Sequence, residues 1–198
     1  SLTKKKSDQI IRKYEINKGH YYDNYEDLIN SSEIDAIYIA TLNNTHADLI
    51  EKCILARKKI LCEKPMCLNL DEAKKIYTYL QNSSIFFVEG FAYRSHKQTS
   101  EMCNIINSGE IGKIVEIESS FGFKSKINPN SRLFNKNFGG GAILDIGCYA
   151  TSFSLLIARA TLGEKYRNYK LQNVLGYLGE TRVDVHAEAD LIFNEELK

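Results

Sequence analysis

A glutamate and a lysine, Glu63 and Lys64, stand side by side directly in front of Pro65. They follow a short apolar run, residues 59–62, which we interpret as a buried strand whose end is a common place for ligands. A lysine that is partly desolvated has a lowered pKa and can act as an acid, a base or an electrostatic anchor. The alternative is a surface ion pair before a turn proline, and a Lys-Pro pair alone does not decide between the two.

Three consecutive glycines, residues 139–141, precede a helix that carries Asp145 and Tyr149. Triple glycine permits close approach of the backbone to a ligand or a neighbouring element. Side chains four residues apart project from the same face of a helix. Asp145 stands among aliphatic residues, where a carboxylate is costly to bury without a partner. The two side chains are therefore candidates for chemistry; the alternative is a satisfied core carboxylate and a packing aromatic.

Residues 41–46 also lie between an expected strand and an expected helix. The start of a helix offers free backbone N–H groups and a positive dipole end to an anion or a polar ligand. The alternative is simple helix capping, because Thr45 and Asp48 have the spacing of a capping box.

The elements that must hold these residues alternate between strand and helix. Short apolar runs at residues 36–40, 59–62 and 85–88 predict three strands. A helix is expected after each of the first two, and Asn69 with Glu72 predicts a capping box for the second helix. This alternation predicts a parallel sheet, with ligands bound at the carboxyl ends of its strands.

The second half of the chain has a different pattern. A helix is expected over residues 98–107, and residues 113–123 and 183–193 then alternate apolar and polar side chains. Half-polar strands of this kind belong to antiparallel sheets with one covered face. We therefore expect a parallel α/β unit over residues 1–92 and an antiparallel α+β unit over residues 93–198.

The composition of the 198 residues argues against several classes of function. Lysine plus arginine number 26 and aspartate plus glutamate 25, so the net charge of +1 offers no strong positive field for a nucleic acid. No apolar run approaches the roughly 18 residues of a membrane span. The five cysteines form no CxxC pair. We therefore expect no disulfide framework and no metal site, but reduced thiols in a cytoplasmic protein.

Four motifs follow one another in a recognisable order: Ala40-Thr41-x-Asn43-x-x-His46, Glu63-Lys64-Pro65, Glu89-x-Phe91-x-Tyr93-Arg94 and Gly139-Gly140-Gly141-Ala142-x-x-Asp145-x-Gly147-x-Tyr149. This order closely resembles the Gfo/Idh/MocA family of NAD(P)-dependent oxidoreductases, over essentially the whole chain. Position 149 is a tyrosine, where many relatives carry histidine. In this the sequence resembles the branch that contains dimeric dihydrodiol dehydrogenase and glucose–fructose oxidoreductase.

The resemblance implies a fold and a cofactor. The implied fold is a Rossmann-type parallel sheet that binds NAD or NADP, followed by an α+β domain with a large open antiparallel sheet over the substrate. The sequence departs from the family pattern because no G-x-G-x-x-G motif occurs in it. We therefore expect a fragment that lacks the N-terminal Gly-rich loop and the C-terminal end, and that binds NAD(P)H weakly when expressed alone.

The resemblance also implies a reaction, in which the secondary alcohol of a sugar, polyol or cyclic diol loses a hydride to the nicotinamide and a proton to a base. Tyr149 is the expected proton acceptor, its pKa lowered by the ammonium of Lys64. Asp145 is expected to orient the substrate hydroxyl or Lys64. The expected cofactor contacts are Thr41, Asn43, His46, Glu63 and Lys64. His46 is expected to contact backbone or ribose and not to act as a base. The expected substrate contacts are Tyr93, Arg94 and Asp145.

Two other interpretations stay open at this point. The family includes regulators that keep the fold and bind a dinucleotide without turnover, although a binding module has no need of Lys64 and Tyr149 as proton carriers. The chain could also be a folded fragment with no activity of its own. In relatives the outer face of the antiparallel sheet often pairs two subunits, so we expect a homodimer or a higher homo-oligomer.

Overall fold

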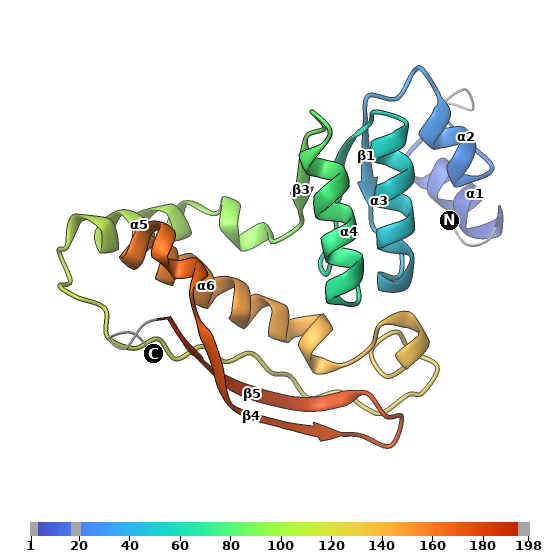
Figure 1. Cartoon of the computed structure of the whole chain (residues 1–198). Helices are drawn as coiled ribbons and strands as arrows, with labels where there is room; N and C mark the ends of the chain where they lie inside the picture. The colour runs from blue at the N-terminus through green and yellow to red at the C-terminus, as the bar shows by residue number, and fades with distance from the viewer. Residues whose placement is uncertain (1–3, 17–20, 194–198) are drawn as a thin grey trace.

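The computed structural model describes residues 4–16 and 21–193, which form two sheets and the helices packed on them (Figure 1). The helices are α1 (Lys4–Lys13), α2 (Tyr25–Asn30), α3 (His46–Leu55), α4 (Leu70–Gln81), α5 (Lys97–Ser108) and α6 (Cys148–Leu162). The strands are β1 (Ala36–Ile39), β2 (Lys59–Cys62), β3 (Phe87–Glu89), β4 (Lys170–Leu178) and β5 (Asp184–Ile192). A 3₁₀ turn, η2 (Asn43–Thr45), precedes α3, and a π-helical turn, η5 (Ile143–Gly147), precedes α6.

The first sheet is parallel and has the strand order β1-β2-β3. Ile37 pairs with Ile60, and Ile60 pairs with Phe87. All three expected strands are present, the third starting two residues later than predicted and ending at Glu89. Because the strands are parallel, their carboxyl ends lie at one edge of the sheet, and the residues that follow them are brought together there.

The core of this unit lies between the sheet and the helices α3 and α4, which cover one of its faces (Figure 1). Alternation along the strands turns Ile39 and Ile60 toward the helices, where they meet the fully buried Ile50. The opposite face carries a row of exposed apolar side chains across the three strands: Tyr38, Leu61 and Val88.

The two predicted capping boxes have different outcomes. Asn69 caps α4 as expected, because its side chain accepts a hydrogen bond of 2.9 Å from the backbone N–H of Glu72. Thr45 does not cap α3, so that prediction is wrong. The 3₁₀ turn η2 leads into α3, and the Thr45 hydroxyl instead donates to the backbone oxygen of Leu42, 2.8 Å away.

The second unit contains α5, η5, α6 and a hairpin of the antiparallel strands β4 and β5. The expected strand over residues 183–193 is confirmed as β5, whereas β4 was not anticipated. The expected strand over residues 113–123 is wrong, since no strand is assigned there. Alternation marks a segment that can form a strand, but a strand also needs the edge of another strand to pair with. The antiparallel sheet of the described residues therefore has two strands.

The helical run Lys136–Arg167 is long and apolar enough, by length and composition, to cross a membrane. Asp145 and Arg159 interrupt this run, so the expectation that no continuous apolar run reaches about 18 residues is not contradicted. The core helix of a soluble protein meets the same criterion. Within this run, Ala158 of α6 packs against Phe193, and Asp145 of η5 contacts the first unit through Lys64.

We predict that α3 stabilises the first unit through its buried face alone. Replacing the fully buried Ile50 by alanine should lower the free energy of unfolding by about 2–5 kcal/mol, because it leaves a cavity in the core. Leu55 on the same helix has 68% of its surface exposed, so Leu55→Ala should change stability little. Urea unfolding of the two variants provides the comparison, and equal losses would contradict the described core.

Candidate active site

Lys64 and Asp145 meet across the two units at the carboxyl end of the parallel sheet. Lys64 follows β2, and Asp145 lies in η5. The Lys64 ammonium donates to the backbone oxygen of Asp145, and its Nζ lies 3.6 Å from the carboxylate Oδ1. Only 14% of the Lys64 side chain and 11% of the Asp145 side chain are exposed. The carboxylate that is costly to bury is thus provided with a cationic partner.

A second cation, Arg132, reaches the same carboxylate from the loop before the glycines. Its Nη1 donates to Asp145 Oδ1 over 2.8 Å, and about half of its side chain is exposed. Asp145 is therefore held between an ammonium on the side of the sheet and a guanidinium on the side of the loop. Sequence reasoning missed Arg132, because a lone arginine in an irregular loop has no periodicity or motif to mark it.

Tyr149 lies one turn after Asp145, and its ring faces the same ammonium. Lys64 Nζ lies 4.9 Å from the centroid of the Tyr149 ring, a distance typical of a cation–π contact. The rings of Phe91 and Phe121 pack edge-on against Tyr149, with centroids 5.5 and 5.6 Å away. Lys64, Asp145 and Tyr149 thus lie close together, as expected. Aromatic rings pack around Tyr149, and one of them, Phe121, comes from the irregular segment 113–123.

The environment of Tyr149 raises the pKa of its phenol above the usual value of 10.0. Burial is the largest cause, and the nearby acidic groups of Cys148, Glu63 and Asp145 act in the same direction. The expectation that Lys64 lowers this pKa is therefore wrong. Lys64 is not among the groups that shift this pKa, and its ammonium lies over the face of the ring and near the Asp145 carboxylate. At neutral pH Tyr149 carries its proton.

Close packing at the triple glycine holds the helix that carries these residues. The backbone oxygen of Gly139 accepts a hydrogen bond of 3.0 Å from Asn43, and a side chain at Gly139 would overlap Leu68. Gly141 has a φ of +120° and lies against Asp184, whose carboxylate accepts a 2.6 Å hydrogen bond from the backbone N–H of Ile143. The glycines therefore let η5 approach both the first unit and β5, as the sequence suggested in general terms.

The residues expected at the cofactor lie at the ends of β1 and β2, but several of their polar atoms are bound internally. The Thr41 hydroxyl lies 2.6 Å from that of Thr45, and Asn43 uses its amide on Gly139. Glu63 accepts a hydrogen bond from the hydroxyl of Tyr38, on the exposed face of the sheet. Hydroxyl, amide, carboxylate and ammonium groups thus gather at the strand ends, where parallel sheets bind dinucleotides.

His46 is almost fully buried and contacts the backbone. Its Nδ1 lies 2.8 Å from the backbone oxygen of Pro65, and its Nε2 lies 3.3 Å from that of Thr41. Of the two contacts that the sequence left open for His46, backbone or ribose, the structure shows the backbone contact.

Glu89, at the end of β3, belongs to the third motif but was not assigned a role. Its carboxylate accepts a hydrogen bond of 2.8 Å from the backbone N–H of Met66. Burial raises the pKa of Glu89, an effect opposed by the Met66 N–H and by the charge of Arg94. Glu89 therefore helps to hold the backbone of the turn that follows Lys64.

Tyr93 and Arg94, expected at the substrate, both contact Ser152 of α6. The hydroxyls of Tyr93 and Ser152 lie 2.8 Å apart. Arg94 donates to the Ser152 hydroxyl over 3.1 Å and to its backbone oxygen over 3.0 Å. These contacts tie the segment after β3 to the helix that carries Tyr149.

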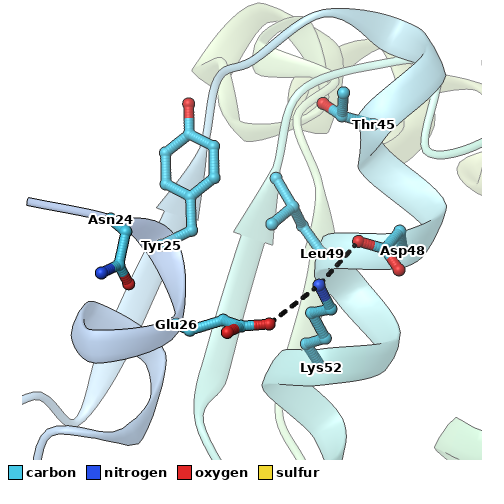
Figure 2. Close-up of a pocket in the computed structure, with 7 residues that line it drawn as sticks. All are labelled: Asn24, Tyr25, Glu26, Thr45, Asp48, Leu49 and Lys52. Carbon is cyan, nitrogen blue, oxygen red and sulfur yellow. Dashed lines mark hydrogen bonds and ion pairs between the residues drawn. The ribbon is translucent and has the colours of Figure 1, made fainter. Parts of the chain in front are cut away.

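A pocket elsewhere in the first unit is separate from this site. Figure 2 shows it between α2 and α3, with the Lys52 ammonium 3.5 Å from Glu26 and 3.2 Å from Asp48. None of the predicted site residues lines it. Among the described residues, no group of three or more histidine, cysteine, aspartate or glutamate side chains could hold a metal ion.

Two family models account for most of the chain. Residues 1–91 match the oxidoreductase family with the NAD-binding Rossmann fold, and residues 99–194 match the GFO/IDH/MocA C-terminal domain. The chain belongs to the Gfo/Idh/MocA oxidoreductase family. The fold is accordingly a Rossmann-type parallel sheet followed by an α+β unit with an antiparallel sheet.

Curated relatives include sugar and diol dehydrogenases. The chain is 32% identical to D-xylose 1-dehydrogenase (NADP(+)) 2 of Haloferax volcanii over 75% of its own length and 44% of the relative. It is 31% identical to trans-1,2-dihydrobenzene-1,2-diol dehydrogenase of Xenopus laevis over 82% of its own length and 47% of the relative. The chain therefore spans about half the length of these relatives.

Solved structures share the fold. The aldose-aldose oxidoreductase of Caulobacter crescentus, complexed with glycerol, superposes with a TM-score of 0.82 at 23% identity, over 98% of this chain and 58% of that one. The 3-ketoreductase KijD10 of Actinomadura kijaniata, in complex with NADP and TDP-benzene, superposes with a TM-score of 0.74 at 24% identity, over 89% and 52%. At these identities the likeness establishes the arrangement of the elements.

We predict that Tyr149 titrates above pH 10 and that Asp145 contributes to this shift. Its negative charge disfavours the phenolate, so Asp145→Asn should lower the pKa of Tyr149 relative to the unchanged chain. Carbon-13 NMR of ring-labelled tyrosine, with the Tyr149 signal assigned from Tyr149→Phe, measures both values. A Tyr149 that titrates below 10 in the unchanged chain would contradict the described environment.

Proposed function

We propose that this protein transfers a hydride between a nicotinamide dinucleotide, NAD or NADP, and a secondary alcohol of a sugar, polyol or cyclic diol. The observation that carries the proposal is the meeting of Lys64, Asp145 and Tyr149 at the carboxyl end of the parallel sheet. An ammonium, a carboxylate and a phenol in contact, largely shielded from water, form a set of groups suited to proton transfer at a carbonyl or hydroxyl oxygen.

In this proposal Tyr149 exchanges the proton with the substrate oxygen. Its raised pKa keeps the phenol protonated at neutral pH, which is the state required to donate a proton while a carbonyl is reduced to an alcohol. In the opposite direction the phenolate would accept the hydroxyl proton. When bound, the nicotinamide supplies or accepts the hydride. Lys64, held by Asp145, places a positive charge next to the oxygen on which negative charge develops.

The remaining predicted residues have proposed roles that fit their places. We assign the nicotinamide-bearing half of the dinucleotide to the ends of β1 and β2, and the substrate to the space that borders η5 and the segment after β3. The proposed cofactor residues are Thr41, Asn43, His46, Glu63 and Lys64. The proposed substrate residues are Tyr93, Arg94 and Asp145. In this scheme residues 1–92 form the dinucleotide-binding domain and residues 93–198 the substrate domain.

The relatives support this substrate class, since their names include a xylose dehydrogenase and a dihydrobenzenediol dehydrogenase. Reduced thiols support a cytoplasmic location. All five cysteines are free, and burial raises the pKa of Cys53 to about 11 and that of Cys62 to about 12. Thiols in this state are inert, as is usual for buried cysteines in a reducing compartment.

We predict that Lys64→Met and Tyr149→Phe each lower kcat by about 10²-fold or more, because each removes a group that moves or stabilises the transferred proton. Tyr14→Phe, at an exposed tyrosine after α1, is the matched control and should leave kcat unchanged. The measurement is the formation of NAD(P)H by the purified enzyme with a panel of sugars, polyols and cyclic diols. Turnover near that of the unchanged enzyme in both variants would refute the proton-transfer role.

We also propose a homodimer that forms through the outer face of the β4–β5 sheet. Leu191 and Phe193 pack toward α6, so the alternate residues face outward. The outward face includes the exposed Leu175 and Tyr177, which pair with Glu188 and His186 of β5.

We predict a dimeric mass by light scattering at micromolar concentration and a monomeric mass for the double variant Leu175→Lys/Tyr177→Lys. A charge on that face would oppose burial of the apolar side chains. Val185→Lys, on the inner face of the same sheet, is the control and should leave the mass unchanged. A monomeric mass for the unchanged protein would overturn the proposal.

A further inference from the structure

The second peptide unit after Lys64 has both of its polar groups bound by side chains. It joins Pro65 to Met66, so it contains the carbonyl of Pro65 and the N–H of Met66. His46 Nδ1–H donates to that carbonyl over 2.8 Å, and the Glu89 carboxylate accepts from that N–H over 2.8 Å. The two side chains come from different elements, the start of α3 and the end of β3.

Such an arrangement is unusual, because backbone groups in a protein interior mostly pair with other backbone groups. Pro65 is buried, so its polar neighbours have little access to water. A buried backbone group without a hydrogen-bond partner is unfavourable. His46 and Glu89 provide these partners. Because one binds the carbonyl and the other binds the N–H, they also hold the peptide plane in one orientation.

Only Pro65 separates this peptide from Lys64. Lys64 is the residue before Pro65, and its side chain must reach both the backbone oxygen of Asp145 and the face of the Tyr149 ring. A change in the orientation of the Pro65–Met66 peptide would have to be taken up by Pro65 and by the backbone of Lys64, and a shift of that backbone would withdraw the ammonium from the second unit.

We infer that Glu89 and His46 are positioning residues that clamp the Pro65–Met66 peptide and thereby hold the Lys64 ammonium against Asp145 and Tyr149. This inference deepens the proposed function and rests on it, because Lys64 matters for turnover only if it serves the transfer. Neither side chain touches the reacting atoms in this scheme. They affect the reaction only by fixing the position of the Lys64 ammonium.

The chain offers a matched control for Glu89. Glu72 accepts a hydrogen bond of 2.9 Å from the backbone N–H of Leu68, two residues after Met66. It also accepts one from Asn69, and it belongs to α4. Glu72→Met therefore removes a carboxylate–backbone hydrogen bond from the same stretch of chain without releasing the Pro65–Met66 peptide.

The test observes Lys64 directly and needs no turnover. Lysines are labelled biosynthetically with carbon-13, which leaves the ammonium unchanged, and the Lys64 signal is assigned from Lys64→Arg. In the unchanged chain we expect the signals of the Lys64 CH₂ group next to the ammonium to be displaced from those of exposed lysines by the ring current of Tyr149. Glu89→Gln, which keeps an acceptor oxygen, should preserve this displacement. Glu89→Met should abolish it, and Glu72→Met should preserve it.

Retention of the displaced signal in folded Glu89→Met, or its loss in Glu72→Met, would overturn the inference. If Glu89→Met does not fold, two further results decide. The Met66 amide of the unchanged chain should exchange slowly with deuterated water, and Glu89→Gln should keep the displaced Lys64 signal. Fast exchange at Met66 would refute the clamp.

In the active enzyme, Glu89→Met should lower kcat by up to about 10²-fold with little change in the KM of the dinucleotide, and Glu89→Gln should restore most of kcat. Absence of any turnover in the unchanged enzyme would count against the proposed function alone, because the Lys64 signal and the Met66 exchange are measured without substrate.

Discussion

The contact between Lys64 and Asp145 is the interaction on which the arrangement of this molecule depends. It joins the end of β2 in the first unit to η5 in the second, and both side chains are largely removed from water. Charges in such a place are unfavourable unless each has a partner, and a buried pair adds little net stability over an apolar one. Its value here is positional. The pair requires the two units to meet at this point, and it sets the ammonium over the Tyr149 ring.

Much of the surrounding structure serves to make that meeting possible. The triple glycine removes side chains where η5 would otherwise overlap Leu68 and Asp184. Asn43 of the first unit binds the backbone of Gly139 in the second, so a further hydrogen bond joins the units beside the ion pair, while Arg94 binds Ser152 within the second unit. Several polar groups at the strand ends therefore hold the site together, which explains why so many of them are bound internally.

The proposed chemistry differs from the sequence-based expectation in the state of Tyr149. An ammonium beside a phenol would favour the phenolate, but the geometry places Lys64 over the ring, with Asp145 and Arg132 beside it. Burial and acidic neighbours then raise the pKa of the phenol. In the proposed reaction the protonated phenol therefore gives its proton to the substrate oxygen, and the cation stabilises charge on the substrate more than charge on the tyrosine.

The sequence by itself determined the parallel unit, including the three strands and the Asn69 cap of α4, because alternation, apolar runs and caps are local signals. Motif order also marked Lys64, Asp145 and Tyr149. Only the tertiary structure decided that residues 113–123 form no strand, that Arg132 pairs with Asp145, and that Glu89 binds Met66. It also decided the pKa of Tyr149. These features depend on strand partners, burial and charges contributed by distant parts of the chain, which spacing along the sequence does not encode.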